Sequence, residues 1–390
     1  MPEPLLLDLS HTSHTQARTG IQRVARALDK VLGDRARPIT FDPWQDVWRP
    51  LRPWEMRSLD RSEPTSTRGA RWPWTARVAG LMRNFAESKP VLPPHHGLLV
   101  PELFSPGVAR ALPELFRATN GPRLALFHDA IALRRPDLSP SGTVGRFPAY
   151  LRELLAFDGV AAVSEDSRQS LAAYWDWLGV SRRPELVAIP LGSDPVTPAV
   201  GTATRSDEPP IVLCVGTLEG RKNHLALLEA CAELWQRGDR FTLHLIGATQ
   251  AQTGAAARER IRRLQTEGRP LRYDGPVDDA QLAAAYAACS FTVYPSLLEG
   301  FGLPVLESLA HGKPCVCSGQ GALGESARAG GCLALESVDA AGLRDAIAAL
   351  LASPTRRDHL AAEARARRPR TWPDYVADLT AWAETVRRRT

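Results

Sequence analysis

The sequence predicts an α/β protein made of two Rossmann-like, doubly wound domains, and three observations support this prediction. The chain has 390 residues, which is more than one ordinary hydrophobic core holds and suits two α/β domains of similar size. Short apolar runs alternate with stretches of helical periodicity in both halves, as in a parallel sheet covered by helices on both faces. Residues 194–210 lack periodicity and contain Pro, Thr, Gly and charged residues, so they are expected to be an interdomain linker.

The first predicted domain covers residues 1–193. Leu5–Leu9 is an apolar strand, and apolar residues recur at helical spacing between Ile21 and Leu32. Later patterns indicate three more strands and three more helices: strands at 124–127, 160–163 and 186–190, and helices at 108–118, 150–157 and 168–178.

The second predicted domain covers residues 211–370 and repeats the alternation. Its expected elements are strands at 211–215, 241–246, 271–273, 291–294 and 315–317, and helices at 225–235, 280–288 and 303–311. A helix in residues 371–390, beginning near Trp372, follows, and its return to the first domain is one arrangement that the sequence leaves open. Doubly wound domains bind ligands outside the carboxyl ends of their strands, so the two domains are expected to face each other across a cleft.

Composition excludes several other classes of protein. Hydrophobic residues make up 44% of the chain and charged residues 23%, which is typical of a globular protein rather than a disordered one. No apolar run is long enough to cross a bilayer. The first residues, MPEPLLLDLS, carry no basic stretch before a short apolar run, so they predict a strand and not a signal peptide. A cytoplasmic protein is expected, and its net charge of +5 suits anionic ligands or an anionic membrane surface.

The cysteines are expected to be structural. All six lie in the second half and none forms a C-x-x-C pair. Most fall in expected strands or helices, where cysteine behaves as a small buried hydrophobic residue in a reducing compartment. A metal site at Cys315 and Cys317 would need a matching His or Cys pair, and the sequence offers none at a suitable spacing. No metal site is therefore expected.

A candidate phosphate-binding segment lies at the start of the second domain. Gly216-Thr217-Leu218-Glu219-Gly220-Arg221-Lys222-Asn223 follows an expected strand and precedes an expected helix. The N-terminus of a helix offers unpaired N–H groups and a partial positive charge, which favour phosphate. Arg221 and Lys222 would add two cations at the same place. The alternative is an ordinary solvated helix start.

A second motif, YPSLLEGFGLPVLE, covers residues 294–307 and places two acids around a strand–turn–helix junction. Glu299 falls in the Gly-rich turn, and Glu307 falls on the helix that begins near Pro304. Carboxylates accept hydrogen bonds from sugar hydroxyls. Glu307 is a solvated helix residue in the alternative interpretation, but its neighbours are apolar nearly all round the helix, and an acid there needs a partner.

These motifs resemble those of the retaining glycosyltransferases of family 4, which have the GT-B fold. The pattern Y-P-S-x-x-E-G-F-G-L-P-x-L-E is similar to the E-x7-E signature of that family, and V-G-T-L-E-x-R-K-N is similar to its phosphate-binding segment. Three segments of the first half, residues 126–129, 163–168 and 189–194, also resemble family motifs. The resemblance covers residues 4–385, apart from one segment rich in Trp and Arg.

The resemblance implies a role for each matching residue. Arg221 and Lys222 would hold the donor diphosphate, Glu307 the nucleotide ribose, and Glu299 would face the donor sugar. His128 would lie beside the donor sugar, or would be a hydrogen-bonded histidine at a strand end. The implied catalytic residues are Glu299, His128, Arg221 and Lys222. The implied donor-binding residues are Gly20, Gly216, Thr217, Arg221, Lys222, Ser296, Gly300, Phe301, Gly302, Leu303 and Glu307.

The resemblance also implies a reaction. A hexose, with mannose favoured and GDP-mannose as its donor, would pass from a nucleotide-diphosphate sugar to a saccharide or lipid-linked acceptor with retention of configuration. Bacterial surface polysaccharide synthesis, including the O-antigen of lipopolysaccharide, is the implied setting. No metal, other cofactor or nucleic acid is expected. The alternative is a non-catalytic GT-B-like protein that binds a sugar nucleotide, whereas a Rossmann oxidoreductase would need a G-x-G-x-x-G motif that neither half supplies.

Residues 44–89 are the segment that the family pattern does not explain. They hold five of the ten tryptophans and nine Arg or Lys residues against five Asp or Glu. Tryptophan and arginine together suit the headgroup layer of an anionic membrane, where a lipid-linked acceptor would lie. The alternatives are a loop whose tryptophans cover the core of the first domain, or a contact in a homodimer.

Overall fold

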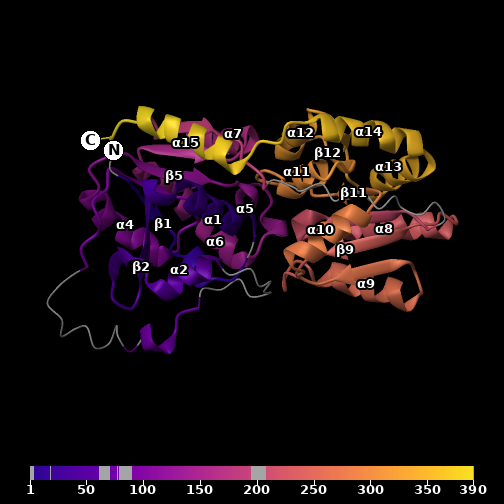
Figure 1. Cartoon of the computed structure of the whole chain (residues 1–390), viewed down its shortest axis with the longest axis horizontal. Coiled ribbons are helices and arrows are strands. Elements are labelled where there is room, and N and C mark those ends of the chain that lie inside the picture. Colours follow the sequence, from indigo (N-terminus) through magenta and orange to yellow (C-terminus); the bar gives the residue numbers. More distant parts are fainter. Residues whose placement is uncertain are drawn as a thin grey trace. The chain divides into compact units, whose positions relative to one another are not determined.

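The computed structural model describes residues 4–17, 19–60, 71–76, 78, 90–194 and 208–389. The chain divides into two compact units, and Figure 1 labels many of their elements. Unit 1 comprises Met1–Asp129, Arg146–Gly192 and Trp372–Thr390, and unit 2 comprises Ala130–Gly145 and Ser193–Thr371. Among the described helices, none is long and apolar enough to span a bilayer.

Unit 1 is built on a seven-stranded sheet in the order β3-β2-β1-β4-β5-β6-β7. All neighbouring strands are parallel except β2 and β3, which are antiparallel. The strands are β1 (Leu5–Asp8), β2 (Ala36–Asp42), β3 (Val47–Pro50), β4 (Gly97–Val100), β5 (Arg123–Phe127), β6 (Gly159–Ala162) and β7 (Glu185–Ala188). Its inner strands are almost continuously apolar, as expected where helices cover both faces.

The helices of unit 1 bury one apolar stripe each. Val24, Ala25 and Leu28 of α1, for example, are completely buried. Ser164 caps α7 by accepting a hydrogen bond from the Ser167 N–H. The helices are α1 (Gly20–Leu32), α2 (Pro53–Asp60), α4 (Pro106–Ala118), α7 (Glu165–Trp177) and α15 (Trp372–Thr385), together with most of α6 (Ser141–Glu153).

Unit 2 is built on a six-stranded, fully parallel sheet in the order β10-β9-β8-β11-β12-β13. The strands are β8 (Ile211–Val215), β9 (Thr242–Ile246), β10 (Leu271–Asp274), β11 (Phe291–Tyr294), β12 (Cys315–Ser318) and β13 (Cys332–Leu335). The helices are α5 (Ile131–Arg134), α8 (His224–Gln236), α9 (Ala255–Thr266), α10 (Asp279–Ala288), α11 (Leu303–Ala310), α12 (Gly321–Ala327), α13 (Ala340–Ala352) and α14 (Pro354–Ala366).

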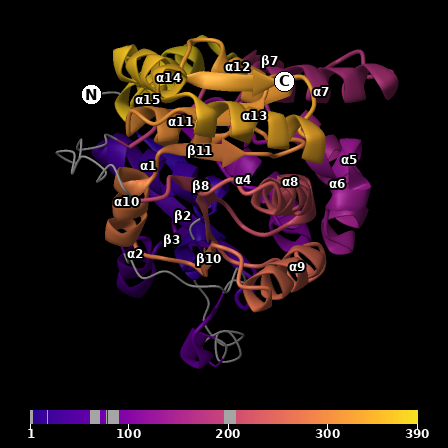
Figure 2. The ribbon, with the colours of Figure 1, turned by 90° about the vertical axis from the view of Figure 1, so that its right-hand side faces the viewer.

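Helices cover both faces of the sheet of unit 2 (Figure 2). Successive side chains of a strand point to opposite faces. Val212 of β8 accordingly packs in one core cluster with residues of α8, α9 and α13, whereas Leu213 packs in another with residues of α10. A third cluster lies between β12, α11 and α12. The predicted α/β class with two doubly wound domains is confirmed.

Both sheets contain a switch point, at which the direction of winding reverses. In unit 1 the chain runs from β1 to β2 on one side and later enters β4 on the other, so the switch lies between β1 and β4. In unit 2 the corresponding switch lies between β8 and β11. Ligands of doubly wound sheets bind outside the carboxyl ends of the strands at this point.

Many of the predicted elements match those of the structure, and others were missed. The strand predicted at 291–294 is β11, and the helix predicted at 303–311 is α11. β2 was missed because its ARPITFD sequence contains Pro and charged residues, and the four-residue apolar strand β4 was missed as well. The sequence also failed to indicate β3, β13, α2, α5, α9, α12, α13 and α14, and the helix predicted at 150–157 overlaps only the last turn of α6.

The division into units differs from the predicted boundaries in one place. Residues 130–145 group with unit 2 rather than with the first half of the chain. Leu138 in this segment approaches Gly220 of unit 2, where an added Cβ would lie 3.3 Å from the leucine Cδ2. The C-terminal helix α15 groups with unit 1, where Trp382 donates a hydrogen bond to Glu185 at 2.7 Å. Most of the predicted linker, residues 195–207, lies outside the described residues.

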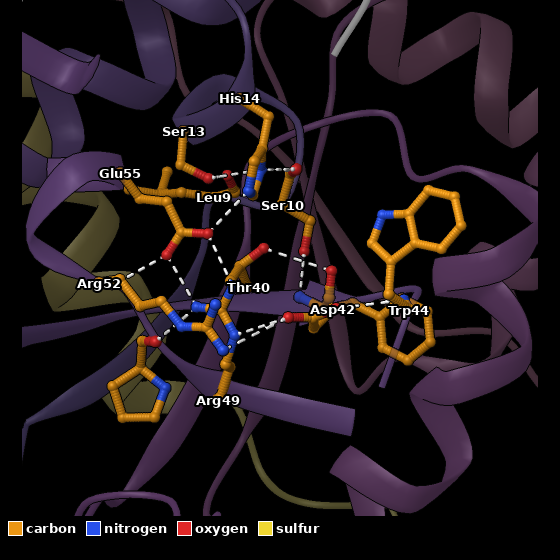
Figure 3. A network of polar contacts seen from close by, with 12 residues as sticks. Leu9, Ser10, Ser13, His14, Thr40, Asp42, Trp44, Arg49, Arg52 and Glu55 are labelled. Atoms are coloured by element: carbon orange, nitrogen blue, oxygen red, sulfur yellow. Dashed lines mark hydrogen bonds and ion pairs between the residues drawn. The ribbon is translucent and has the colours of Figure 1, made fainter. Parts of the chain in front are cut away.

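Part of the Trp- and Arg-rich segment is packed into unit 1 (Figure 3). Arg49 is buried and binds Glu55 at 2.7 Å and Asp42 at 3.0 Å, while His14 binds Glu55 at 2.8 Å. The Trp72 ring stacks on His14 with ring centroids 3.8 Å apart. These contacts agree with the interpretation in which tryptophans cover the core of the first domain.

The remaining tryptophans of this segment divide into buried and exposed ones. Trp48 is buried and donates a hydrogen bond to the Ala111 carbonyl at 3.0 Å, and Trp54 meets His14 edge-on. Trp44 and Trp74 are 44% and 73% exposed. Arg61, Arg68, Arg77, Arg83 and Lys89 lie outside the described residues, so the membrane interpretation stays a prediction.

Candidate functional site

The candidate site of unit 2 lies at the switch point of its sheet. The loop after β8 contains Gly216 and Thr217 and leads to a 3-10 turn, η6 (Gly220–Lys222), directly before α8. The turn after β11 contains Ser296 to Gly302 and leads into α11. The Leu297 N–H donates to the Arg221 carbonyl at 2.8 Å, so these two loops are fastened to each other. The two sequence motifs therefore meet at one place.

Glu299 is at the centre of this site. One of its carboxylate oxygens binds Nη1 of Arg221 at 2.6 Å, and the other binds Nζ of Lys222 at 2.6 Å. The Tyr294 hydroxyl donates to Glu299 at 3.0 Å and also contacts the Lys222 ammonium. Glu299 is only 9% exposed and Lys222 only 7%. Three residues that the sequence assigns to donor chemistry thus form one buried cluster.

The electrostatics of the cluster favour an ionised Glu299. Burial by itself would raise the pKa of this carboxyl, but the charges of Arg221 and Lys222 lower the pKa to about 2. Arg221 also binds Glu219 at 2.7 Å. Two cations therefore balance two carboxylates, and the cluster carries no net charge.

Local backbone geometry brings the loops close enough for this cluster. Gly302 precedes α11 with a φ of 99°, and a Cβ there would lie 2.7 Å from a Leu323 methyl carbon. Gly247, after β9, has a φ of 147°, and a Cβ there would lie 2.1 Å from the Gly216 carbonyl oxygen. Only glycine fits either position. Asn223, before α8, has a left-handed backbone and its side-chain amide donates to the Val338 carbonyl at 2.7 Å.

Glu307 has the partner that its apolar surroundings require. The Tyr286 hydroxyl of α10 donates to its carboxylate at 3.2 Å. The Tyr286 ring in turn stacks on His311 with centroids 4.6 Å apart. Glu307 is half-buried, so this acid is held in place while part of it stays open to solvent.

The other donor-binding candidates of unit 2 lie in the same two loops. Gly216, Thr217, Gly300 and Phe301 are partly exposed, and Leu303 is buried at the start of α11. Ser296 is completely buried. Within the described residues, its Oγ and the Nδ1 of His224, the first residue of α8, are buried polar atoms without a hydrogen bond, which is uncommon unless water or a ligand supplies the partner.

Two candidates lie in unit 1. His128 follows β5 and is buried, and its Nε2 lies 2.7 Å from the Pro101 carbonyl oxygen. Burial lowers the pKa of His128, so the ring is neutral near pH 7. Gly20 is the exposed first residue of α1. His128 therefore has the strand-end hydrogen bond of the structural alternative, with Nδ1 left over for other chemistry.

Sequence reasoning missed a pair of acids at the switch point of unit 1. Asp8 ends β1, and Glu102 follows β4 by two residues. Burial raises the pKa of Asp8 to about 7 and also raises the pKa of Glu102. Asp8 accepts hydrogen bonds from Ser10, and Glu102 accepts them from the hydroxyl and N–H of Thr12. The sequence did offer a signal for Asp8, because an acid lies at the end of an apolar strand there.

Sequence reasoning also missed the aromatic partners of the two acids in unit 2. Tyr294 binds Glu299 and Tyr286 binds Glu307. Tyr294 was visible as the last residue of a strand immediately before a loop motif. Tyr286 had no such signal, because it lies on a helix 21 residues before its partner.

Comparison with known proteins identifies the domain that carries this site. Residues 209–353 match the model of the family described as Glycosyl transferases group 1. The chain is 26% identical over 332 residues to the serotype-specific mannosyltransferase WbdA of Escherichia coli. This match covers 80% of the chain and 38% of WbdA, so the chain spans less than half the length of that relative.

Two solved structures share the fold over nearly the whole chain. The sucrose-phosphate synthase of Thermosynechococcus elongatus has a TM-score of 0.69 at 20% identity, covering 98% of each chain. HepE of Anabaena, in complex with UDP and glucose, has a TM-score of 0.68 at 16% identity, covering 98% of this chain and 100% of HepE. At these identities the likeness establishes a common architecture.

Proposed function

We propose that this chain, a glycosyltransferase of the GT-B fold with a group 1 glycosyl transferase domain, moves a hexose from a nucleoside-diphosphate sugar to an acceptor hydroxyl with retention of configuration. Mannose is the favoured hexose and GDP-mannose the favoured donor. The relative WbdA, named a mannosyltransferase, supports this choice. The acceptor is a saccharide or a lipid-linked saccharide in surface polysaccharide or O-antigen synthesis.

The cluster of Arg221, Lys222 and Glu299 carries the proposal. It combines two cations with a buried carboxylate at the switch point, where doubly wound sheets bind nucleotides. An incoming diphosphate competes with Glu299 for both cations, because the cluster is already electrically balanced. Charge-assisted hydrogen bonds from Arg221 and Lys222 then hold the phosphate oxygens, and Glu299 is left free to accept hydrogen bonds from the hexose.

Glu307 fits the ribose of the donor. Its carboxylate is held by Tyr286 yet is partly open to solvent. An ionised carboxylate accepts hydrogen bonds from two neighbouring hydroxyls, which is the pattern that a ribose presents. This assignment places the nucleoside beside α11 and the diphosphate beside η6.

The reaction needs no protein nucleophile. The bond between the anomeric carbon and the phosphate oxygen breaks, and its electron pair stays on the nucleoside diphosphate. The acceptor oxygen forms the new bond on the same face and gives its proton to the departing phosphate. Arg221 and Lys222 stabilise the charge that develops on the leaving group. These side chains supply the cationic charge, so we propose that the reaction requires no metal ion.

Unit 1 is assigned to the acceptor. At its switch point the partly exposed Ser10 and His11 lie beside the buried acids Asp8 and Glu102, and a hydroxyl and an imidazole suit hydrogen bonding to a polyhydroxylated molecule. A contact of residues 44–89 with an anionic membrane surface on the cytoplasmic side would bring the enzyme to a lipid-linked acceptor, and vesicle sedimentation at low and high salt tests it.

A donor panel tests the proposal. Thermal unfolding is followed with GDP-mannose, UDP-glucose and dTDP-glucose, and transfer is assayed as release of the nucleoside diphosphate. GDP-mannose is expected to give the largest rise in Tm, because it is the proposed donor and should bind most tightly. A ligand at 100 times its Kd stabilises the folded protein by about 2.7 kcal/mol. Chelation of divalent metal ions is expected to leave transfer unchanged.

Variants identify the site in the same assay. Lys222→Ala is expected to lose most of the donor-induced rise in Tm. Arg262→Ala, which removes an exposed cation on α9 of the same unit, is expected to keep it. If no nucleotide sugar stabilises the chain, the proposal is wrong. Binding without transfer to any acceptor would instead identify a non-catalytic sugar-nucleotide-binding protein.

A further inference from the structure

Three cysteines of unit 2 meet on one face of its sheet. Cys315 and Cys317 are two residues apart on β12, so their side chains point to the same face. Cys332 is the first residue of β13 and pairs directly with Cys315 in the parallel ladder. The three sulfur atoms all lie within 4.8 Å of one another. The partner missing from the local sequence pattern of Cys315 and Cys317 is therefore supplied by the neighbouring strand.

The turn before β13 fixes the position of Cys332. Gly330 and Gly331 have φ angles of 88° and 78°, a conformation that other residues rarely adopt. A Cβ at Gly331 would lie 2.7 Å from a Leu309 methyl carbon, so a larger residue would displace the chain from α11. β13 is also the last strand of the sheet, and Cys332 is half-buried whereas Cys315 and Cys317 are buried. Cys332 thus provides a route from solvent to the two deeper sulfur atoms.

The surroundings of the sulfur atoms are apolar. Cys315 and Cys317 pack with Val305 and Leu309 of α11 and with Leu323 of α12. Among the described residues, no His, Asp or Glu ligand atom joins the three sulfur atoms within the same distance of one another. Mg²⁺ and Ca²⁺ require oxygen ligands, and structural Zn²⁺ almost always takes four ligands. A site of three sulfur atoms packed against apolar side chains suits a soft cation that accepts three ligands.

We propose that Cys315, Cys317 and Cys332 form a binding site for a single Cu(I) ion, separate from the donor site. Each thiol loses its proton as its sulfur binds the metal, and copper enters and remains as Cu(I), so no oxidant or reductant is consumed. With a metal–sulfur distance of about 2.3 Å, as for other thiolate sites, three sulfur atoms around one ion lie roughly 4 Å apart, which the observed cluster accommodates. Arg367 and Glu363 bring one positive and one negative charge close to Cys332, so the charges of these two side chains oppose each other at the site.

Competition for Cu(I) tests the site. The reduced, full-length protein is titrated without oxygen against a Cu(I)–bicinchoninate complex, whose colour fades as the protein removes the metal. One equivalent of Cu(I) per chain is expected. Cys332→Ala is the most informative variant, because the side chain is half-buried and its loss disturbs the core least. Its apparent Kd for Cu(I) is expected to rise by more than roughly 10–100-fold. A loss of that size is typical when a residue that only supports a metal ligand is removed, and Cys332 is itself a ligand.

The controls separate metal binding from folding and from sugar transfer. Cys289→Ala removes a buried cysteine outside the cluster and is expected to bind one equivalent like the wild type. Cu(I) is also expected to slow alkylation of Cys332 by iodoacetamide, a measurement that needs no variant. The proposal is overturned if the wild type removes no copper from the chelator, if Cys332→Ala binds as tightly as the wild type, or if Zn²⁺ binds the three thiols and Cu(I) does not. None of these measurements involves a nucleotide sugar, so their outcome is independent of the proposed transfer reaction.

Discussion

Both units have acids at the switch point of the sheet, but the pKa values of these acids are shifted in opposite directions. In unit 2, Glu299 lies beside the carboxyl ends of β8 and β11 and is paired with Arg221 and Lys222, which lower its pKa to about 2. In unit 1, Asp8 lies beside the carboxyl ends of β1 and β4, and burial raises its pKa to about 7. Asp8 is hydrogen-bonded to the hydroxyl and N–H of Ser10. One switch point is therefore ionic, and the other carries hydroxyls and a carboxyl that keeps its proton up to a pH of about 7.

This difference follows the ligand that each unit is proposed to bind. A diphosphate brings several negative charges, and it can exchange places with a carboxylate that already holds two cations in position. A saccharide acceptor is neutral, and hydroxyl and carboxyl groups satisfy its hydrogen bonds without a change in net charge. The contrast thus supports assignment of the donor to unit 2 and of the acceptor to unit 1.

A third acid shows that an ion pair alone does not mark a ligand site. Glu55 of unit 1 is completely buried, and Arg49 and His14 lower its pKa to about 2, against the effect of burial (Figure 3). Unlike Glu299, it lies on a helix, α2, and not in the turn between a strand and a helix at the switch point. Its role is to fasten α2 to β3 and to the segment after β1.

The largest expected effect concerns this structural network. Arg49→Met leaves Glu55 and Asp42 buried without their shared cation, and such a loss typically costs about 3–5 kcal/mol. Urea unfolding followed by tryptophan fluorescence reports on unit 1, because nine of the ten tryptophans belong to it. Arg57→Met, at an exposed position of α2, is the matched control and should change the free energy of unfolding by less than about 0.5 kcal/mol. Similar losses in the two variants would contradict the network.

The second effect is a dependence of stability on pH. The pKa of Asp8 is raised in the folded protein to about 7, from an ordinary value of 3.8. Between these two values the folded state holds a proton that the unfolded state has released, so the free energy of unfolding falls as pH rises from about 4 to about 7. A shift of this size corresponds to a few kcal/mol, on the order of 1.4 kcal/mol per pH unit.

Asp8→Asn is expected to reduce this fall, since the amide has no proton to lose and its oxygen still accepts from Ser10. The raised pKa of Glu102 contributes the part of the fall that remains. The measurement is the free energy of unfolding from urea titrations at several pH values. Asp34→Asn, at an exposed position, should leave the slope unchanged. Equal slopes for wild type and Asp8→Asn would show that Asp8 is ionised in the folded protein, and the contrast with Glu299 would disappear.

The sequence predicted more residues of the site in unit 2 than of the site in unit 1, for a physical reason. Glu299, Glu307, Arg221 and Lys222 lie in two continuous stretches, each at a strand–loop–helix junction, so local patterns were enough to bring them to notice. That Glu299 would bind both cations could not be predicted, because the contact joins residues 78 positions apart. In unit 1, Glu102 meets Thr12 across 90 positions through the pairing of β1 with β4, and β4 itself was not predicted.

The three clustered cysteines also show that contacts between residues distant in the sequence are hard to predict, although their separation in the sequence is smaller. The local spacing of Cys315 and Cys317 offered no matching pair, and a metal site was rejected on that ground. Cys332 becomes their neighbour only because β13 pairs in parallel with β12, after a crossover that contains α12. Local patterns predicted the fold class and about half of the α-helices, whereas contacts between strands set the chemistry of the sites.

The third prediction tests whether Glu299 competes with the diphosphate. Glu299→Gln removes a negative charge but keeps an oxygen that can face the sugar. Donor binding is expected to stay as tight or to tighten, because Arg221 and Lys222 no longer share their charge with a carboxylate. Turnover is expected to fall on the order of 100-fold, as for loss of one group that acts in the transition state. Steady-state kinetics and the Kd of the nucleoside diphosphate measure both effects. Glu259→Gln, on the exposed face of α9, is the control, and weaker binding in Glu299→Gln would show that its carboxylate supports phosphate rather than competing with it.

The smallest expected effect concerns Glu307, whose carboxylate accepts a hydrogen bond from the neutral Tyr286 hydroxyl. Glu307→Gln keeps an oxygen that can accept this hydrogen bond and removes the negative charge. Hydrogen bonds to the ribose then weaken from charged to neutral, a difference of about 1 kcal/mol or slightly more. The KM for the donor is expected to rise about tenfold while kcat changes little, because the ribose contact is the same in the ground state and the transition state. Glu267→Gln, at an exposed position after α9, should change neither constant. A fall in kcat at constant KM would place Glu307 beside the reacting sugar, and the ribose would then have to be held by other residues of unit 2.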